Sequence, residues 1–228
     1  ASTPSPEAEF TREGSTVRWI QLPDDAAPAE AINAHLIQSA ANWIGFFECG
    51  ARFAPQLLLS LSDYLAIHPE WRLVYTDEDT IDEEGNRQSP LFKPDFNLEL
   101  LRSADYIGSL FVERNALLAA GGYAKNAEAT YLDIALRVAD ALGDPALGHI
   151  PDVLLHIPTA AFRRASEGGA AQALREHLGR RSIDADVFQG LAEGATRRIL
   201  YRHPATPMVS IIIPTRNCLE LLRPCVAS

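Results

Sequence analysis

Apolar residues along the chain alternate between short β-rich runs and stretches with helical spacing. The runs predict strands over 17–22, 43–47, 71–75, 106–112, 153–156 and 209–214. Apolar positions three or four residues apart predict helices over 28–41, 55–68, 115–120, 131–142 and 169–180, with another beginning at 219. A hairpin is expected around 190–194. Because strands and helices alternate, the sequence predicts an α/β fold with a largely parallel sheet.

Glycine and proline mark where these elements end. Pro69 stops the second helix, Gly85 is expected at positive φ in a turn, and Gly121 with Gly122 closes the helix over 115–120. The character of the chain changes after residue 203. We therefore expect one unit over 1–203, a linker over 204–208, and the first strand and helix start of a second unit over 209–228.

Composition narrows the classes of function. The 228 residues include 30 acidic and 20 basic side chains, giving a formal net charge of −10. Without a basic stripe, this charge argues against a nucleic-acid partner. No apolar run approaches the roughly 18 residues of a membrane span. Cys49, Cys218 and Cys225 form no disulfide framework, which favours a reducing cytoplasmic location.

Several motifs, taken in order, resemble those of bacterial family 2 glycosyltransferases of surface-polysaccharide synthesis. They occupy 74–79 (VYTDED), 81–85, 92–96 (FKPDF), 121–123, 133–137, 150–156 and 209–217 (VSIIIPTRN). Each motif is short, and it is their order along nearly the whole chain that carries the resemblance.

The resemblance implies a GT-A fold, which is a Rossmann-like, mixed and mainly parallel sheet with flanking helices that binds a nucleotide sugar at the carboxyl ends of its strands. Compared with that family, the chain lacks the first two strands of its domain. The parent protein would use a nucleotide-sugar donor and a glycan acceptor. It would act in the cytoplasm, at the inner face of the membrane.

The family's metal motif, Asp-x-Asp after an apolar strand, corresponds here to Glu48, Cys49 and Gly50. Glu48 is a candidate metal ligand, and Mg²⁺ or Mn²⁺ is the cofactor expected if the donor site survives. Gly50 has no side chain to contribute, however, and a cysteine thiolate is a soft ligand. The alternative is an ordinary turn between a strand and a loop.

The family's general base is an Asp at a helix start, and Tyr131 occupies that place. A tyrosine of ordinary pKa near 10 is a poor base at neutral pH. Asp133, the second Asp of the pattern, is the remaining candidate, although it could simply favour the helix N-terminus. In the closing strand, His156 keeps the family's imidazole but lacks the basic residue that follows.

Asp77, Glu78 and Asp79 form the densest carboxylate cluster, at a predicted strand end. They could form a wall of the donor or acceptor pocket, or belong to a solvated loop. Lys93 could reach the acceptor or a phosphate, or it could lie at the surface over Phe92.

The sequence therefore supports a catalytically impaired fragment of a nucleotide-sugar glycosyltransferase. The alternative is a non-catalytic module that binds glycan or a partner and positions the acceptor for an active neighbouring domain. An open apolar sheet edge invites pairing, and the strand Val209–Ile213 could fill it either in its own chain or, as a homo-oligomer, in a neighbouring copy.

Overall fold

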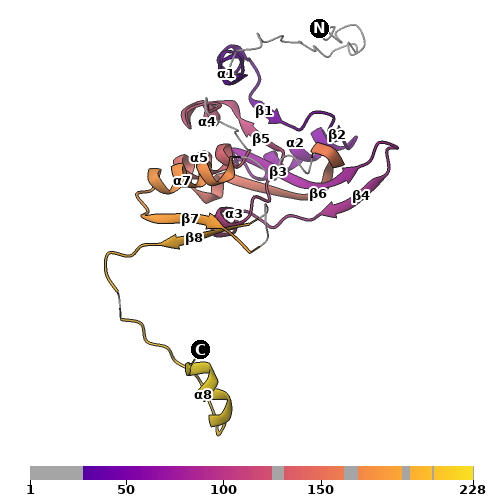
Figure 1. The fold of residues 1–228 in the computed structure, drawn as a ribbon. Helices are drawn as coiled ribbons and strands as arrows, with labels where there is room; N and C mark the ends of the chain where they lie inside the picture. The colour runs from indigo at the N-terminus through magenta and orange to yellow at the C-terminus, as the bar shows by residue number, and fades with distance from the viewer. Residues whose placement is uncertain (1–27, 125–130, 162–168, 192–195, 207, 228) are drawn as a thin grey trace.

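A computed structural model describes residues 28–124, 131–161, 169–191, 196–206 and 208–227 (Figure 1). The helices are α1 (Pro28–Gln38), α2 (Leu57–Ile67), α3 (Leu98–Ser103), α4 (Arg114–Ala119), α5 (Tyr131–Leu142), α7 (Ala170–Arg180) and α8 (Leu219–Ala227). The strands are β1 (Trp43–Phe46), β2 (Arg52–Phe53), β3 (Leu73–Ile81), β4 (Arg87–Leu91), β5 (Leu110–Glu113), β6 (Leu147–Pro158), β7 (Ala185–Gln189) and β8 (Arg197–Tyr201). The predicted strand 17–22 lies outside the described residues.

One mixed sheet organises the body of the molecule, in the order β1-β5-β3-β6-β2, with β4 paired to β3. The longest pairing, β3 with β6, is parallel. The pairings of β1 with β5, β5 with β3, β3 with β4 and β6 with β2 are antiparallel. The predicted mixed α/β sheet with flanking helices is confirmed, while its parallel order is concentrated in the β3–β6 pair. The turn after Ile81 returns the chain as β4, which makes that neighbour antiparallel.

Hydrophobic clusters lie on both faces of the sheet, because successive side chains of a strand point to opposite faces. One cluster contains Leu73 and Tyr75 of β3 with residues of α5 and α7. The other contains Val74 of β3 with Leu57 and Leu61 of α2. The amphipathic pattern therefore places helices over both faces of the sheet (Figure 1).

Some element bounds match the sequence prediction and others do not. The predicted helix over 131–142 is confirmed as α5, and Gly85, Gly121 and Gly122 have positive φ. The first helix ends at Gln38 rather than at residue 41. The predicted strand over 71–75 continues to Ile81. It continues because pairing with β6 persists beyond Thr76, through two register shifts.

The described end of the chain extends away from the body (Figure 1). Val209, Ile211 and Ile212 are 73%, 79% and 89% exposed, and α8 contains no buried residue. The strand predicted over 209–214 has no strand beside it among the described residues and is not formed. None of the described helices is long and apolar enough to cross a membrane.

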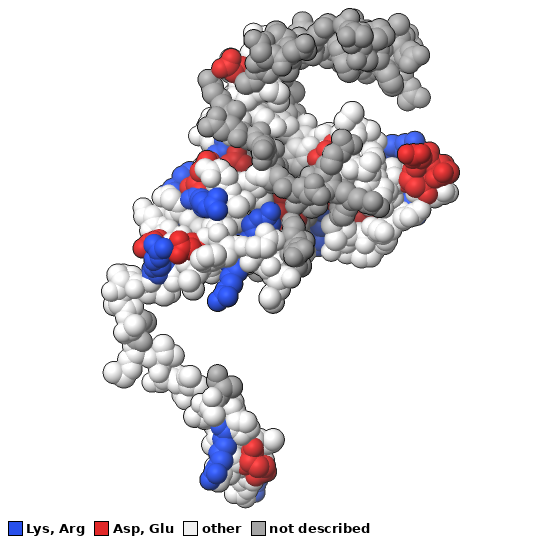
Figure 2. Space-filling view, viewed as in Figure 1, with Lys and Arg blue, Asp and Glu red and all other residues white. Residues whose placement is uncertain are grey.

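Charge on the face shown in Figure 2 is mixed, with one acidic tip. Glu83 and Glu84 are exposed in the turn that joins β3 to β4, at the end of that hairpin. Elsewhere on this face, acidic and basic residues are interspersed.

Candidate functional site

The three consecutive carboxylates Asp77, Glu78 and Asp79 lie inside β3 and are buried, at 3%, 5% and 4% exposure. The sequence prediction that these carboxylates lie at a strand end or in a solvated loop is therefore wrong. Burying a carboxylate is costly unless it is paired, and each of the three has a basic partner among the described residues. The alternation of a strand also turns neighbouring side chains to opposite faces.

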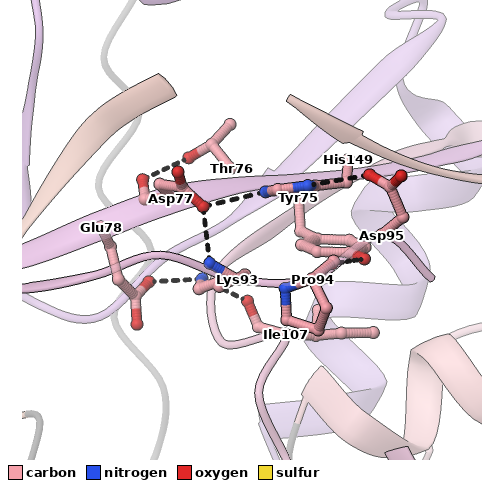
Figure 3. Close-up of polar contacts among 9 residues, drawn as sticks. All are labelled: Tyr75, Thr76, Asp77, Glu78, Lys93, Pro94, Asp95, Ile107 and His149. Atoms are coloured by element: carbon pink, nitrogen blue, oxygen red, sulfur yellow. Dashed lines mark hydrogen bonds and ion pairs between the residues drawn. The ribbon is translucent and has the colours of Figure 1, made fainter. Parts of the chain in front are cut away.

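Asp77 ties two other segments to β3 (Figure 3). Its Oδ1 accepts a hydrogen bond from the backbone N–H of Lys93 at 2.8 Å and lies 2.9 Å from Nε2 of His149. The other ring nitrogen of His149 lies 3.3 Å from Oδ1 of Asp95, whose side chain is exposed. The His149 ring stacks on Tyr75, whose hydroxyl donates to the Pro94 carbonyl at 2.7 Å. Asp77 and His149 thus hold the 93–95 segment against the sheet.

Glu78 forms a buried ion pair with Lys93. The Lys93 Nζ lies 2.9 Å from Oε2 of Glu78 and donates to the Ile107 carbonyl at 2.6 Å (Figure 3). Burial lowers the pKa of Lys93, and the Glu78 carboxylate opposes that shift. Gly108, at φ +61, allows the approach, because a Cβ there would lie 3.1 Å from both Glu78 oxygens. Lys93 is therefore not a surface lysine over Phe92, and its ammonium group is engaged within the fold.

Asp79 joins β3 to its two neighbouring strands. His156 of β6 places Nδ1 2.6 Å from Oδ1 of Asp79, and Arg87 of β4 donates from Nε to Oδ2 at 2.6 Å. Both oxygens of this carboxylate are thus occupied. The candidate residues Asp79 and His156 are brought together by the fold, and each is engaged with the other.

A second group of polar side chains lies at the end of β1. Glu48 follows this strand, and Tyr131 begins α5. Burial raises the pKa of Tyr131, and the nearby Glu48 carboxylate raises it further. Burial, then Asp133 and Glu48, also raise the pKa of Tyr123, whose ring stacks on Phe46 with centroids 5.6 Å apart. We name Glu48, Tyr123, Tyr131 and Asp133 the β1 corner.

Asp133 is the one buried carboxylate of the β1 corner, at 4% exposure. Its Oδ2 accepts from Nε of Arg137 at 2.9 Å, and Nη2 of the same guanidinium lies 2.8 Å away. Arg137 also donates to the carbonyls of Ala120 and Gly122, each at 2.7 Å. Asp133 therefore orients an arginine that secures the end of α4.

The residues that follow β1 fit a divalent metal poorly. Cys49 is exposed and Gly50, at φ +87, provides no ligand, so Glu48 has no neighbouring carboxylate in its own turn. In the described part of the chain, no three His, Cys, Asp or Glu side chains are grouped so that they could hold a metal ion.

Sequence reasoning did not single out His149, and it included Asp95 and Tyr123 only as members of the motifs over 92–96 and 121–123. His149 is 72 residues from its partner Asp77, so local spacing cannot reveal their contact. A longer prediction for β6, which includes residue 149, would have placed His149 beside β3 through the parallel register Tyr75↔His149.

No family model matches the chain. It is 32% identical over 242 residues to the O-antigen biosynthesis protein RfbC of Myxococcus xanthus, covering all of this chain and 19% of that protein. It is also 31% identical over 235 residues to the uncharacterized protein y4gI of Sinorhizobium fredii, covering 96% of this chain and 25% of that protein. The chain thus spans a quarter or less of these curated relatives.

Similar solved structures are more distant. Residues 1–349 of TarS from S. aureus give a TM-score of 0.45 at 12% identity, over 68% of this chain and 51% of that one. Glucosyl-3-phosphoglycerate synthase from Mycobacterium tuberculosis, in complex with phosphoglyceric acid, gives 0.43 at 15%, over 79% and 64%. The sequence similarity thus extends over the whole chain to a protein named for O-antigen biosynthesis.

Proposed function

We propose that the chain is a segment of a nucleotide-sugar-dependent glycosyltransferase of bacterial surface-polysaccharide synthesis, and that this segment does not itself transfer sugar. One observation carries the second part of the proposal. Asp77, Glu78 and Asp79, the densest carboxylate cluster, are buried and paired with His149, Lys93, His156 and Arg87. A donor or a metal would have to displace these internal partners in order to bind there.

The β1 corner supports the same proposal. A base must be deprotonated near the working pH, and the raised pKa of Tyr131 keeps its hydroxyl protonated at neutral pH. Asp133 is held by Arg137. Mg²⁺ or Mn²⁺ would have Glu48 alone in its turn, so metal-dependent donor binding would belong to another part of the parent protein.

Calorimetric titration tests the proposal. The chain is titrated with UDP, GDP and dTDP, each with and without Mn²⁺, and we expect no heat of binding. A longer protein that continues past residue 228 provides the matched sample and should bind one nucleotide. Micromolar, Mn²⁺-dependent binding by the chain alone would refute the proposal and direct attention to Glu48 and to Asp77–Asp79.

A second function, that of a module binding glycan or a partner and positioning the acceptor, rests on a different observation. Tyr123 and Phe46 form a half-buried stacked pair beside Glu48, and an aromatic face next to a carboxylate can hold an apolar surface and its hydroxyl groups together. Chemical-shift changes on titration with surface-polysaccharide fragments would test it. Tyr123→Ala should weaken binding, whereas Tyr64→Ala on α2, which packs on the opposite face of the sheet, should not.

The remaining expectations concern partners and location. The net charge of −10 and the mixed surface in Figure 2 support a function without nucleic acid. The proposed location in the cytoplasm, at the inner face of the membrane, rests on the family resemblance alone. The exposed residues of Val209–Ile213 support either a second unit, over 209–228, or pairing between copies. Light scattering distinguishes these outcomes, because deletion of 208–228 changes the oligomeric state only if copies pair through this run.

A further inference from the structure

The turn that follows α4 has its backbone held from two sides. On one side, Arg137 donates to the carbonyls of Ala120 and Gly122, each at 2.7 Å. On the other side, Asn33 of α1 binds the backbone of Tyr123. Its Nδ2 donates to the Tyr123 carbonyl at 2.7 Å, and its Oδ1 accepts from the Tyr123 N–H at 2.8 Å. The Asn33 amide therefore pairs with both backbone groups of one residue, as a residue of a neighbouring antiparallel strand does.

Gly122 provides the space that this contact needs. It is buried and has φ +73, and a Cβ built on it would lie 2.4 Å from Oδ1 of Asn33. Gly121 also has a positive φ, +99, but a Cβ there would meet, among the described residues, only Nη1 of Arg137 at 3.7 Å. A positive φ favours glycine at both positions. The close approach of Asn33 gives Gly122 a second reason to be glycine, and Gly121 has no such reason.

The position of the Tyr123 backbone determines where its ring can lie at the β1 corner. The ring stacks on Phe46, at the end of β1, with centroids 5.6 Å apart and an angle of 29° between the planes. Asp133 and Glu48 are near enough to raise the pKa of Tyr123, in addition to the larger effect of burial. Because the backbone fixes the direction of the Cα–Cβ bond, a shift of this turn would carry the ring away from these three neighbours.

We propose that Asn33 is the positioning residue of the β1 corner: by binding the Tyr123 backbone, it holds the Tyr123 ring on Phe46 as the aromatic face that a sugar ring would contact. The apolar face of the sugar would lie on this pair, and one of its hydroxyl groups would reach the Glu48 carboxylate. Asn33 does not touch the sugar and acts through Tyr123. The sugar contact rests on the second function proposed above, whereas the positioning of the ring does not.

The alternative is that Asn33 only attaches α1 to the body of the molecule. α1 has a second attachment, however, because Leu36 is 3% exposed and belongs to the hydrophobic cluster shared with α5 and α7. Leu36 lies three residues after Asn33 on the same helix and has no hydrogen bond to the Tyr123 backbone. A variant of each residue therefore separates loss of the Tyr123 contact from loss of helix packing.

Nuclear magnetic resonance compares Asn33→Ala with Leu36→Ala. In the unaltered chain we expect NOEs between the rings of Tyr123 and Phe46. Asn33→Ala should remove them, and the pKa of Tyr123 should fall toward its ordinary 10 as the ring leaves its buried place. Leu36→Ala should keep both the NOEs and the pKa of the unaltered chain. Retained NOEs in Asn33→Ala, or an equal loss in both variants, would overturn the proposal.

A pair of glycine variants gives a second test that leaves Asn33 in the sequence. Gly122→Ala and Gly121→Ala both place a Cβ at a positive φ, but only the first meets Asn33. Gly122→Ala should therefore remove the NOEs between Tyr123 and Phe46, and Gly121→Ala should retain them. The same result in both variants would contradict the proposal. This pair decides if Asn33→Ala does not fold.

Titration with surface-polysaccharide fragments separates the positioning of Tyr123 from the proposed function. Asn33→Ala should weaken binding about tenfold, which is the order expected for one misplaced aromatic contact, and Leu36→Ala should bind as the unaltered chain does. If the unaltered chain does not bind while Asn33→Ala still loses the NOEs, the positioning role stands and the glycan function fails. Unchanged affinity in an Asn33→Ala variant that has lost the NOEs would refute a role of Asn33 in glycan binding.

Discussion

The centre of the sheet and the β1 corner differ in how far their polar side chains are buried and paired. In β3, three successive carboxylates are buried and each is paired with a basic side chain from a neighbouring segment. At the β1 corner, Asp133 is likewise buried and paired with Arg137, but Glu48, Tyr123 and Tyr131 remain half-buried. The centre is therefore a structural network, in which removing one charge leaves its partner charge buried and unpaired. The corner keeps polar groups with a route to solvent, which is where a ligand could still be recognised.

The largest loss in the free energy of unfolding is expected at the Lys93–Glu78 pair. Lys93→Ala leaves the Glu78 carboxylate buried without its ion-pair partner, which should lower the free energy of unfolding by about 3–5 kcal/mol. Urea unfolding followed by circular dichroism measures the change. The double variant Lys93→Met/Glu78→Leu removes both charges at similar volume and should recover much of the loss. A cost below about 1 kcal/mol for Lys93→Ala would mean that the pair is not buried as described.

A pair of glycines provides the next comparison. A Cβ at Gly148, in β6, would lie 2.0–2.3 Å from ring atoms of Trp71, whose other ring contacts include the stacked His68. Gly148→Ala should lower the free energy of unfolding by about 1–3 kcal/mol, the usual cost of overpacking.

Gly45, in β1, is the matched edge position. There the added Cβ would meet the ring of Phe47, which follows β1 and itself packs against Phe53 and Phe111. Gly45 is exposed at the sheet edge whereas Gly148 is buried, so Gly45→Ala should cost less free energy of unfolding than Gly148→Ala when both variants are measured by thermal unfolding. An equal cost would show that the edge is packed as firmly as the centre.

Lowering the pH should reduce the free energy of unfolding through one buried histidine, His177. His177 of α7 is fully buried. Its Nε2 accepts from Nε of Arg102 at 3.0 Å, and its Nδ1 lies 2.9 Å from Asp140. Burial lowers the pKa of His177 below its ordinary 6.5. Below about pH 6.5 the unfolded chain therefore binds a proton that the native chain excludes, and stability is lost as the pH falls toward the native pKa.

The measurement is the free energy of unfolding between pH 8 and pH 5, in the native chain and in His177→Gln. The native chain should lose up to about 1.4 kcal/mol per pH unit more than the variant below pH 6.5, which corresponds to one proton. His68→Gln is the control, because it removes a histidine whose side chain is exposed rather than buried. Parallel profiles for the native chain and His177→Gln would exclude His177 as the source.

The same contrast between local and long-range information decides what the sequence could predict. The α5 bounds follow from the helical spacing of Ile134, Val138 and their neighbours, a signal contained within twelve residues. The predicted strand ended at residue 75, before the end of β3, because the polar pattern of Thr76–Thr80 indicates a loop when its partners are unknown. Those partners, Lys93, His149 and His156, lie 15 to 77 residues from the carboxylates that they contact, and the β3–β6 register brings the two histidines beside β3.

The candidate site shows the same limit. Local motifs identified Asp77, Glu78, Asp79 and Lys93 as related residues, but not that they are engaged with one another or with His149. Local motifs also placed Glu48 and Tyr131 at the positions of the family's metal ligand and general base. The fold brings these two side chains close together. Which carboxylate is buried and paired depends on packing across the sheet, and that is absent from any single window of sequence.

The smallest effect is expected at the β1 corner. Glu48→Gln keeps the shape of the side chain and removes its charge, and a half-exposed position away from a buried ion pair should change the free energy of unfolding by no more than about 0.5 kcal/mol. Because the Glu48 carboxylate helps to raise the pKa of Tyr123, the variant should shift this tyrosine toward its ordinary value. Absorbance of tyrosinate followed against pH measures that shift, with Tyr123→Phe identifying the signal. A loss of several kcal/mol instead would place Glu48 among the buried network residues and remove the contrast between the corner and the centre.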